Sequence, residues 1–272
     1  MNRDHIVDGD AIADEIAQKI KDLAVSSPKK RACFISFGVS TAGRSFVEKK
    51  LKIASEIGIV AENREENPKN TAEALSVLKQ ISSQGYDGII VQLPVARFLD
   101  TAILLNAVPR SADIDVLGDI AINAFINKES KRMPPVARVV EKIFKNYSVN
   151  PNGKKIVVLG SGRLVGKPVS IYLKINNIPH VVLDRKTPET ERIEQIKSAD
   201  IVISGIGVPH YIKPDMIKEG VILIDAGTSG EEGRIQGDAD PACQEKAALY
   251  TPVPGGVGPI TVASLFYNLY LT

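Results

Sequence analysis

Apolar residues along the chain occur either at helical spacing or in short continuous runs, and this alternation is typical of an α/β protein. In the first half, helical spacing predicts helices over residues 10–23, 45–57, 70–85 and 99–107. Asp10 is a candidate cap for the first of them. Continuous apolar runs predict strands over residues 31–38, 59–63 and 87–94. Such runs are typical of strands that are covered on both faces of a parallel sheet.

The pattern resumes after a less regular segment, residues 111–135, and we expect the domain change there. A helix over residues 136–144 leads into further predicted strands at 154–160, 180–184, 200–207 and 221–227, and a last helix begins near residue 258. We therefore expect two α/β domains. The first comprises residues 1–120 and is completed by residues 258–272. The second, residues 121–257, has the pattern of a Rossmann-like dinucleotide-binding domain.

Composition excludes several classes of protein. The net charge is +2, from 34 basic and 32 acidic residues, which argues against a nucleic-acid-binding surface. No apolar run reaches the ~18 residues that cross a bilayer, and the first residues lack the apolar core of a signal peptide. Cys33 and Cys243 are too far apart for a metal-type CxxC pair, so we expect neither a disulfide scaffold nor a bound metal. We expect a cytoplasmic protein that does not associate with membranes.

A glycine motif follows the strand predicted over residues 154–160. Gly160, Gly162 and Gly166 form a G-x-G-x-x-x-G variant of the dinucleotide fingerprint and are followed by a helical pattern. The first glycine lets the chain turn, the second leaves room for a pyrophosphate, and the third allows close packing. The alternative is a tight strand-to-helix turn that binds nothing.

Asp184 ends the next predicted strand, where an acid commonly binds the ribose hydroxyls of NAD and repels the extra phosphate of NADP. Arg185 and Lys186 follow at once, and either side chain can hold that phosphate. Asp184 is equally compatible with a surface turn, so the residues alone leave the choice of cofactor open.

Three stretches in the first half carry candidate chemistry. The helix predicted over 45–57 carries Lys49, Lys50 and Lys52, which usually indicates only a solvated face. Gln92 stands at the carboxyl end of a buried strand, where ligands of α/β sheets bind. Asp113 and Asp115 stand in the stretch ADIDV, and acids in loops are more often caps or turn formers than catalysts.

The stretch TPVPGGVGPIT, residues 251–261, precedes the last helix. Its prolines fix φ and remove donors, and its glycines allow another molecule to approach the backbone. The stretch is either a connector that turns the chain or a wall that touches a ligand.

Together and in this order, these motifs resemble the FolD family of bifunctional methylenetetrahydrofolate dehydrogenase/cyclohydrolases over essentially the whole chain. The resemblance is most specific in TPVPGGVGPIT. It implies an active site in a cleft between the two domains, NADP or NAD as hydride acceptor, a tetrahydrofolate substrate and a homodimer. It also implies roles for individual residues. The catalytic group matches Lys50, Gln92 and Asp115. The substrate-binding group matches Phe46, Pro254, Gly255 and Gly256. The cofactor-binding group matches Gly160, Ser161, Gly162, Arg163, Val165, Gly166, Asp184 and Arg185.

Several residues depart from the family pattern. Phe46 replaces a tyrosine, Ala112 replaces a lysine, and Val116-Leu117 replaces Gly-Phe. The usual GRS of the nucleotide loop reads Gly-Ser-Gly at 160–162, and Arg163 is the nearest arginine that can compensate. Two alternatives therefore stand beside the bifunctional enzyme. One is a dehydrogenase with weak or no cyclohydrolase activity, and the other is a non-catalytic relative that binds a nucleotide or folate.

Overall fold

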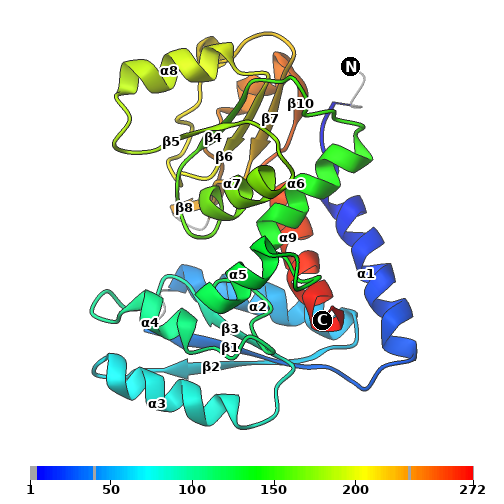
Figure 1. Cartoon of the computed structure of the whole chain (residues 1–272), viewed down its shortest axis with the longest axis vertical. Coiled ribbons are helices and arrows are strands. Elements are labelled where there is room, and N and C mark those ends of the chain that lie inside the picture. The colour runs from blue at the N-terminus through cyan, green and yellow to red at the C-terminus, as the bar shows by residue number, and fades with distance from the viewer. Residues whose placement is uncertain (1–4, 39–40, 232–233, 272) are drawn as a thin grey trace. The chain divides into compact units, whose positions relative to one another are not determined.

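The computed structural model describes residues 5–38, 41–231 and 234–271, and the chain in it forms two compact units (Figure 1). Unit 1 comprises Met1–Ala13 and Val136–Thr261, and unit 2 comprises Asp14–Pro135 and Val262–Thr272. A boundary after residue 120 would fall within α5 (Asp119–Ile126), and one after residue 257 would fall within α9 (Val257–Tyr267).

Unit 2 is built on a parallel sheet in the strand order β2-β1-β3. Its strands are β1 (Arg31–Phe37), β2 (Val60–Glu66) and β3 (Gly88–Gln92). In the central strand β1, the residues from Ala32 to Phe37 are all buried, as the continuous apolar run predicts. The carboxyl ends of these strands lie at one edge of the sheet, and Gln92 ends β3 there.

The two faces of β1 contact different helices. Cys33, Ile35 and Phe37 pack with α3 (Thr71–Ser82) and α4 (Thr101–Asn106) in one apolar core. Phe34 points to the opposite face, where its ring meets the edge of Phe266 with centroids 6.2 Å apart. Side chains alternate along a strand, so Phe34 faces away from this core. Lys50 of α2 (Thr41–Glu56) approaches the face of Phe34, since Lys50 Nζ lies 5.5 Å from the centroid of the Phe34 ring.

Unit 1 is built on a second parallel sheet, in the strand order β10-β7-β6-β4-β5. Its strands are β4 (Ile156–Leu159), β5 (Val181–Leu183), β6 (Ile201–Ser204), β7 (Val221–Asp225) and β10 (Ala247–Tyr250). The next strand in the chain, β5, pairs with one side of β4, and the strand after that, β6, pairs with the other side of β4. The crevice outside the carboxyl ends of β4 and β6 is therefore a switch point, where doubly wound sheets bind their ligands.

Helices α7 (Gly166–Ile175) and α8 (Glu189–Ser198) connect the strands of unit 1, and α8 packs on the sheet through Ile196. The remaining elements are α1 (Gly9–Val25), α6 (Pro135–Asn146), the 3-10 segments η1 (Pro214–Met216), η2 (Pro241–Glu245) and η3 (Asn268–Tyr270), and the hairpin of β8 (Ser229–Glu231) and β9 (Arg234–Gln236). Among the described helices, none has the length and hydropathy to cross a bilayer.

The structure confirms the strands expected from apolar runs and adds elements that the pattern did not predict. These are α5, α8, the β8–β9 hairpin, β10 and the three 3-10 segments. The first helix is capped by Asp8 and not by Asp10, since Asp8 Oδ1 accepts a hydrogen bond from Ala11 N at 2.9 Å. The residues before Asp14 belong to unit 1, because Val7 N donates to Tyr250 O at 2.8 Å.

Candidate functional site

Lys50 of α2 and Gln92 at the end of β3 form a hydrogen-bonded pair in unit 2. Lys50 Nζ donates to Gln92 Oε1 at 3.0 Å. The other end of the same amide is fixed, because Gln92 Nε2 donates to Leu93 O at 2.8 Å. The amide oxygen is therefore held toward the lysine, and the remaining positions on Nζ are available to a substrate or water.

Burial shifts the pKa values of Lys50 and of Asp115 near it. Burial lowers the pKa of Lys50, and the carboxylate of Asp115 acts against that shift. Burial likewise raises the pKa of Asp115, and the charge on Lys50 acts against it. Lys50 Nζ also lies 5.5 Å from the centroid of the Phe34 ring. The structure thus brings together all three residues that were predicted to be catalytic.

The neighbouring lysines on α2 point elsewhere. Lys49 is exposed, and the Lys52 side chain is 80% exposed and lies 4.0 Å from Glu56 Oε1 in an i,i+4 pair. Phe46, one turn before Lys50 on α2, is half-buried. Only Lys50 of the three lysines therefore has the environment of a catalytic group, since its amine is partly desolvated and hydrogen-bonded to a fixed amide.

The two acids of ADIDV have different roles. Asp113 is 3% exposed, and its Oδ2 accepts hydrogen bonds from Leu117 N at 3.1 Å and Gly118 N at 2.8 Å. Burial raises the pKa of Asp113 to about 6, although the Gly118 hydrogen bond opposes the shift. Asp113 therefore shapes the turn that carries Asp115. Within that turn Val116 has a φ of 54°, in the left-handed region that β-branched residues rarely adopt.

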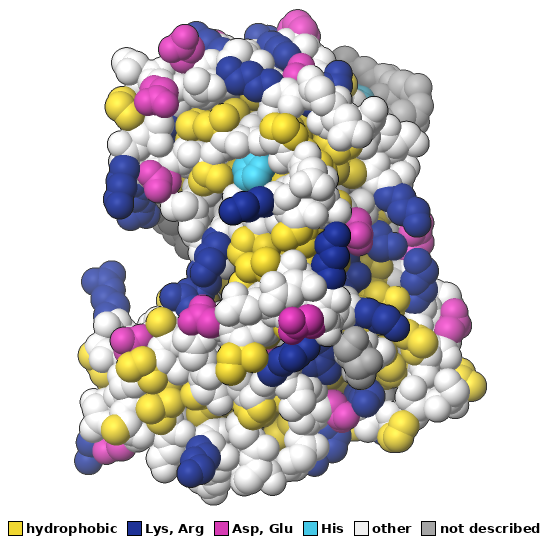
Figure 2. All heavy atoms as spheres, viewed as in Figure 1, with side chains coloured by type: hydrophobic (Ala, Val, Ile, Leu, Met, Phe, Trp, Pro, Cys, Tyr) yellow, Lys and Arg dark blue, Asp and Glu magenta, His cyan; other side chains and the backbone are white. Residues whose placement is uncertain are grey.

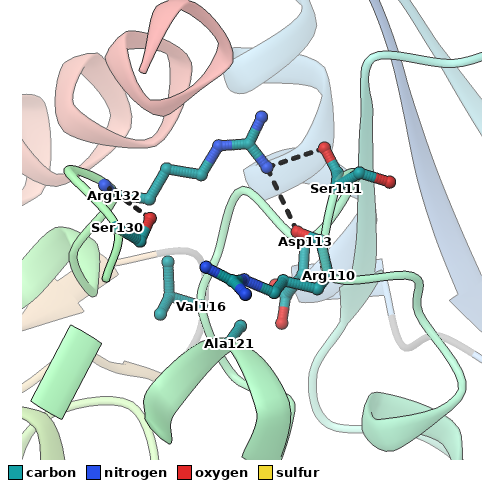
Figure 3. A pocket seen from close by; sticks show the side chains of 7 residues that line it. All are labelled: Arg110, Ser111, Asp113, Val116, Ala121, Ser130 and Arg132. Carbon is teal, nitrogen blue, oxygen red and sulfur yellow. Dashed lines mark hydrogen bonds between the residues drawn. The ribbon is translucent and has the colours of Figure 1, made fainter. Parts of the chain in front are cut away.

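A cavity of about 260 Å³ is lined in part by Asp113 and Val116 of this turn (Figure 3). Its lining residues are Arg110, Ser111, Asp113, Val116, Ala121, Ser130 and Arg132. Arg132 Nη1 donates to the backbone oxygens of Arg110 and Ser111, and its Nε donates to those of Asn268 and Leu271. The Arg132 guanidinium thus connects the C-terminal residues 268–271 to the loop before Asp113 by hydrogen bonds. Lys50, Gln92 and Asp115 do not line the cavity, so we assign it no part in the chemistry.

The predicted nucleotide loop lies at the switch point of unit 1. Gly160 has a φ of 103°, and a Cβ on Gly166 would lie 1.9 Å from Gly160 O, so both positions require glycine. A Cβ on Gly162 would meet no atom within 4 Å. Val165 precedes Gly166, which begins α7. The start of this helix offers fewer N–H groups to an anion than the motif predicts, because Pro168 has none and Lys167 N donates to Gly162 O at 2.9 Å. The loop residues Ser161 to Arg163 are exposed.

Asp184 follows β5 beside this loop. Its Oδ1 accepts a hydrogen bond from Lys186 N at 2.8 Å, and its Oδ2 accepts one from Ser161 Oγ at 3.2 Å. The backbone hydrogen bond from Lys186 and then the Ser161 hydroxyl hold the pKa of Asp184 below its usual range. A carboxylate therefore stands next to the exposed residues Arg185 and Lys186, and the charge of Lys186 also favours its ionised form. Arg163 is exposed in the fingerprint loop.

The loop at 251–256 belongs to unit 1 and packs tightly on itself. A Cβ on Gly256 would lie 2.6 Å from Pro252 O, and a Cβ on Gly9 would lie 1.9 Å from Gly256 O. Gly255 has a φ of 100°, and Pro254 is exposed. The glycines are thus required by the loop's own backbone, and an exposed proline is left at its tip.

Sequence reasoning missed a pair of buried acids in unit 1. Asp225 and Asp238 are both fully buried, and burial raises the pKa of Asp225 to about 6. Asp225 Oδ1 accepts a hydrogen bond from Gly227 N and its Oδ2 accepts one from Ala239 N, each at 2.8 Å. The sequence did contain a signal, since Asp225 ends the apolar run VILID of β7. A buried acid at the end of such a run must be hydrogen-bonded.

Two family models match the chain. The tetrahydrofolate dehydrogenase/cyclohydrolase catalytic domain matches residues 7–115, and the NAD(P)-binding domain of the same proteins matches residues 134–272. The chain belongs to this family. The bifunctional protein FolD of Mycoplasmopsis synoviae is 38% identical over 265 residues, covering 94% of this chain and 93% of the relative. The bifunctional protein FolD of Clostridium tetani is 34% identical over 272 residues, covering 97% of this chain and 97% of the relative.

Solved structures of FolD proteins have the same fold. The bifunctional enzyme of Campylobacter jejuni is 29% identical with a TM-score of 0.89, covering 97% of this chain and 96% of that one. FolD of Trypanosoma brucei, complexed with NADP cofactor and inhibitor, is 28% identical with a TM-score of 0.87, covering 97% and 95%. The FolD resemblance and the two-domain α/β fold are confirmed. Lys50, Gln92 and Asp115 lie in the catalytic-domain match, and the fingerprint loop lies in the NAD(P)-binding match.

Proposed function

We propose that the chain oxidises 5,10-methylenetetrahydrofolate to the 5,10-methenyl form with NADP as hydride acceptor, and hydrolyses that product to 10-formyltetrahydrofolate. The observation that carries the proposal is the hydrogen bond from Lys50 Nζ to a fixed Gln92 amide, with Asp115 as the nearby charge. NAD is a second possible acceptor.

The fingerprint loop fits a dinucleotide. Gly162 leaves open space above the backbone of the exposed loop residues 161–163, and a pyrophosphate can lie against that bare backbone. When bound, the nicotinamide ring would take a hydride from the methylene carbon of the folate. The task of this chain's own residues in that step is alignment, and fixed alignment can account for most of a hydride-transfer rate.

We assign the pterin of the folate to Asp115. A carboxylate at the end of a buried turn can accept two hydrogen bonds from the amino-pyrimidine edge of the ring. Phe46 offers a half-buried ring on the same helix as Lys50, against which the flat pterin can pack. Pro254, Gly255 and Gly256 complete the predicted substrate-binding set.

We assign the hydrolytic step to Lys50. The neutral amine accepts a proton from the water that attacks the cationic methenyl carbon. The resulting ammonium returns that proton to N5 as the carbon–N5 bond breaks, and the hydroxyl proton leaves to solvent as the formyl group forms. Burial lowers the pKa of Lys50 and so increases the share of neutral amine, which favours proton transfer near neutral pH. Gln92 holds the amine in place throughout.

Replacing Lys50 by methionine tests the proposal, and the exposed lysines Lys49 and Lys52 supply matched controls. K50M should lower the cyclohydrolase rate by about 100-fold or more, which is the usual range for general acid–base groups. K49M and K52M should stay near the wild-type rate, because each removes only a solvated charge. Equal small effects at all three positions would remove Lys50 from the mechanism.

Phe46 supports a second candidate, a dehydrogenase with weak cyclohydrolase activity. The family's tyrosine is replaced by a ring without a hydroxyl, so a group that could bind the attacking water is lost. A low ratio of cyclohydrolase to dehydrogenase rate in the wild type, together with a higher ratio in F46Y, would favour this candidate. An unchanged ratio in F46Y would dismiss it.

The chain is further proposed to form a homodimer in the cytoplasm. The edge strand β5 supports the dimer, since Val181 and Val182 on it are 42% and 38% exposed. Light scattering after size-exclusion chromatography tests the dimer, and a monomer at micromolar concentration would overturn it.

Two unpaired, buried cysteines, Cys33 and Cys243, are in keeping with a reducing compartment.

A further inference from the structure

A buried carboxylate, Asp238, holds the loop that follows β6 in unit 1. The Asp238 side chain is fully buried. Its Oδ2 accepts hydrogen bonds from Ser204 Oγ at 2.7 Å and Ile206 N at 2.8 Å, and its Oδ1 accepts one from Val208 N at 2.9 Å. One side chain therefore fixes three alternate residues of a five-residue stretch.

This stretch lies directly against the fingerprint loop. Gly205 N donates to Leu159 O at 3.0 Å. A Cβ on Gly205 would lie 2.3 Å from Val165 Cγ1, and a Cβ on Gly160 would lie 3.1 Å from Gly205 O. The two backbones are thus in contact at the carboxyl ends of β4 and β6, which are neighbours in the sheet (Figure 1).

The far side of the loop after β6 is open to a ligand. Val208 is 43% exposed, and Gly207 is exposed with a φ of 68°. The base of the loop is buried and hydrogen-bonded while its tip is bare. A loop of this kind at a switch point can offer its backbone to a dinucleotide, provided that the backbone is held in one conformation.

We infer that Asp238 is a positioning residue of the dinucleotide site, which holds residues 206–208 in the conformation that receives the bound dinucleotide. The inference rests on the proposed binding of NADP or NAD by unit 1. A carboxylate suits the position because both of its oxygens accept hydrogen bonds, and all three of its partners donate. An asparagine there would set an NH₂ group against at least one of those donors, which would release part of the loop.

The experiment compares Asp238→Asn with Asp113→Asn in the full chain. Asp113 is a matched control, since it is also buried and accepts backbone hydrogen bonds, but its partners Leu117 and Gly118 lie in unit 2. Titration calorimetry with NADP and NAD gives the dissociation constants. D238N should weaken binding by at least about tenfold, and D113N should stay within about threefold of wild type, even where both variants lose stability.

Two further measurements separate positioning from folding. Amide hydrogen exchange should rise over residues 204–209 in D238N, and the dehydrogenase rate should fall relative to the cyclohydrolase rate, because only the former uses the dinucleotide. If D238N does not fold, Ser204→Ala removes one of the three hydrogen bonds and should weaken dinucleotide binding by about threefold or more.

Three results would overturn the inference. D238N, or S204A in its place, could bind both dinucleotides as wild type does. Alternatively, D113N could weaken binding as much as D238N, which would mean that the loss of any buried, hydrogen-bonded acid is responsible. A wild-type chain that binds neither NADP nor NAD would overturn the proposed function and the inference together, and is thereby distinguished from the first two results.

Discussion

Replacing Val116 by glycine and, separately, by alanine tests how the turn after Asp115 is held. Val116 is 1% exposed and has a φ of 54°. Glycine normally follows the second acid in this family, and the structure gives a physical reason, since the turn requires a left-handed residue. Valine contributes buried surface at this position but adopts a conformation that its branched Cβ opposes.

The magnitude follows from comparing the two variants with each other. Both lose the valine methyl groups, so this loss cancels. At an ordinary buried position alanine is more stable than glycine by about 0.5–1 kcal/mol, because glycine loses more conformational freedom on folding. The left-handed conformation costs alanine about 1–2 kcal/mol that glycine does not incur. V116G should therefore have the larger free energy of unfolding of the two, by about 0.5–1 kcal/mol.

Val91 provides the control position. It is 3% exposed, lies in the regular strand β3 of the same unit, and is absent from the left-handed residues of the described chain. There the order should be the usual one, with V91A more stable than V91G. Urea unfolding followed by circular dichroism would give the four free energies. If V116G were less stable than V116A by the same margin as at Val91, the turn would not be strained and the reasoning would fail.

Three other outcomes are expected. Ser161→Arg should raise the NADP-to-NAD ratio of kcat/KM at least about tenfold, from a wild-type preference below about 100-fold; a larger wild-type preference would refute this reading of the nucleotide loop. Gly256→Ala should lower the free energy of unfolding by more than about 1 kcal/mol, whereas Gly162→Ala should change it little, because only the former adds a Cβ into backbone atoms; equal urea midpoints would contradict this. The cyclohydrolase rate should rise with pH as Lys50 loses its proton, with an inflection below 10.5. Asp115→Asn should move that inflection to lower pH, because the carboxylate that favours the charged amine is gone; an inflection that stays in place or moves up would exclude Lys50 as the titrating group.

Acidic and basic side chains are both present on the face in view (Figure 2), in keeping with the similar numbers of acidic and basic residues in the sequence. The sequence also determined where the buried strands lie. Strands such as β1, β3 and β7 are apolar for several residues in succession, and burial on both faces of a parallel sheet requires this. The fingerprint glycines were readable for a similar reason, since the positive φ of Gly160 and the close packing at Gly166 are local features of a tight strand-to-helix turn. The irregular segment 111–135 hid α5, which has only eight residues and no side-chain cap hydrogen bond.

The tertiary structure decided which members of each local group act. Helical spacing places three lysines on α2, but only contact with β3, 42 residues away, selects Lys50. Asp113 and Asp115 are alike in the sequence, and the backbone N–H groups of Leu117 and Gly118 assign the first to the turn. Asp238 meets Ser204 across 34 residues, and no local pattern predicts that contact. Hydrogen bonds and burial between distant segments set the protonation and orientation of these groups, and those partners are chosen only when the chain has folded.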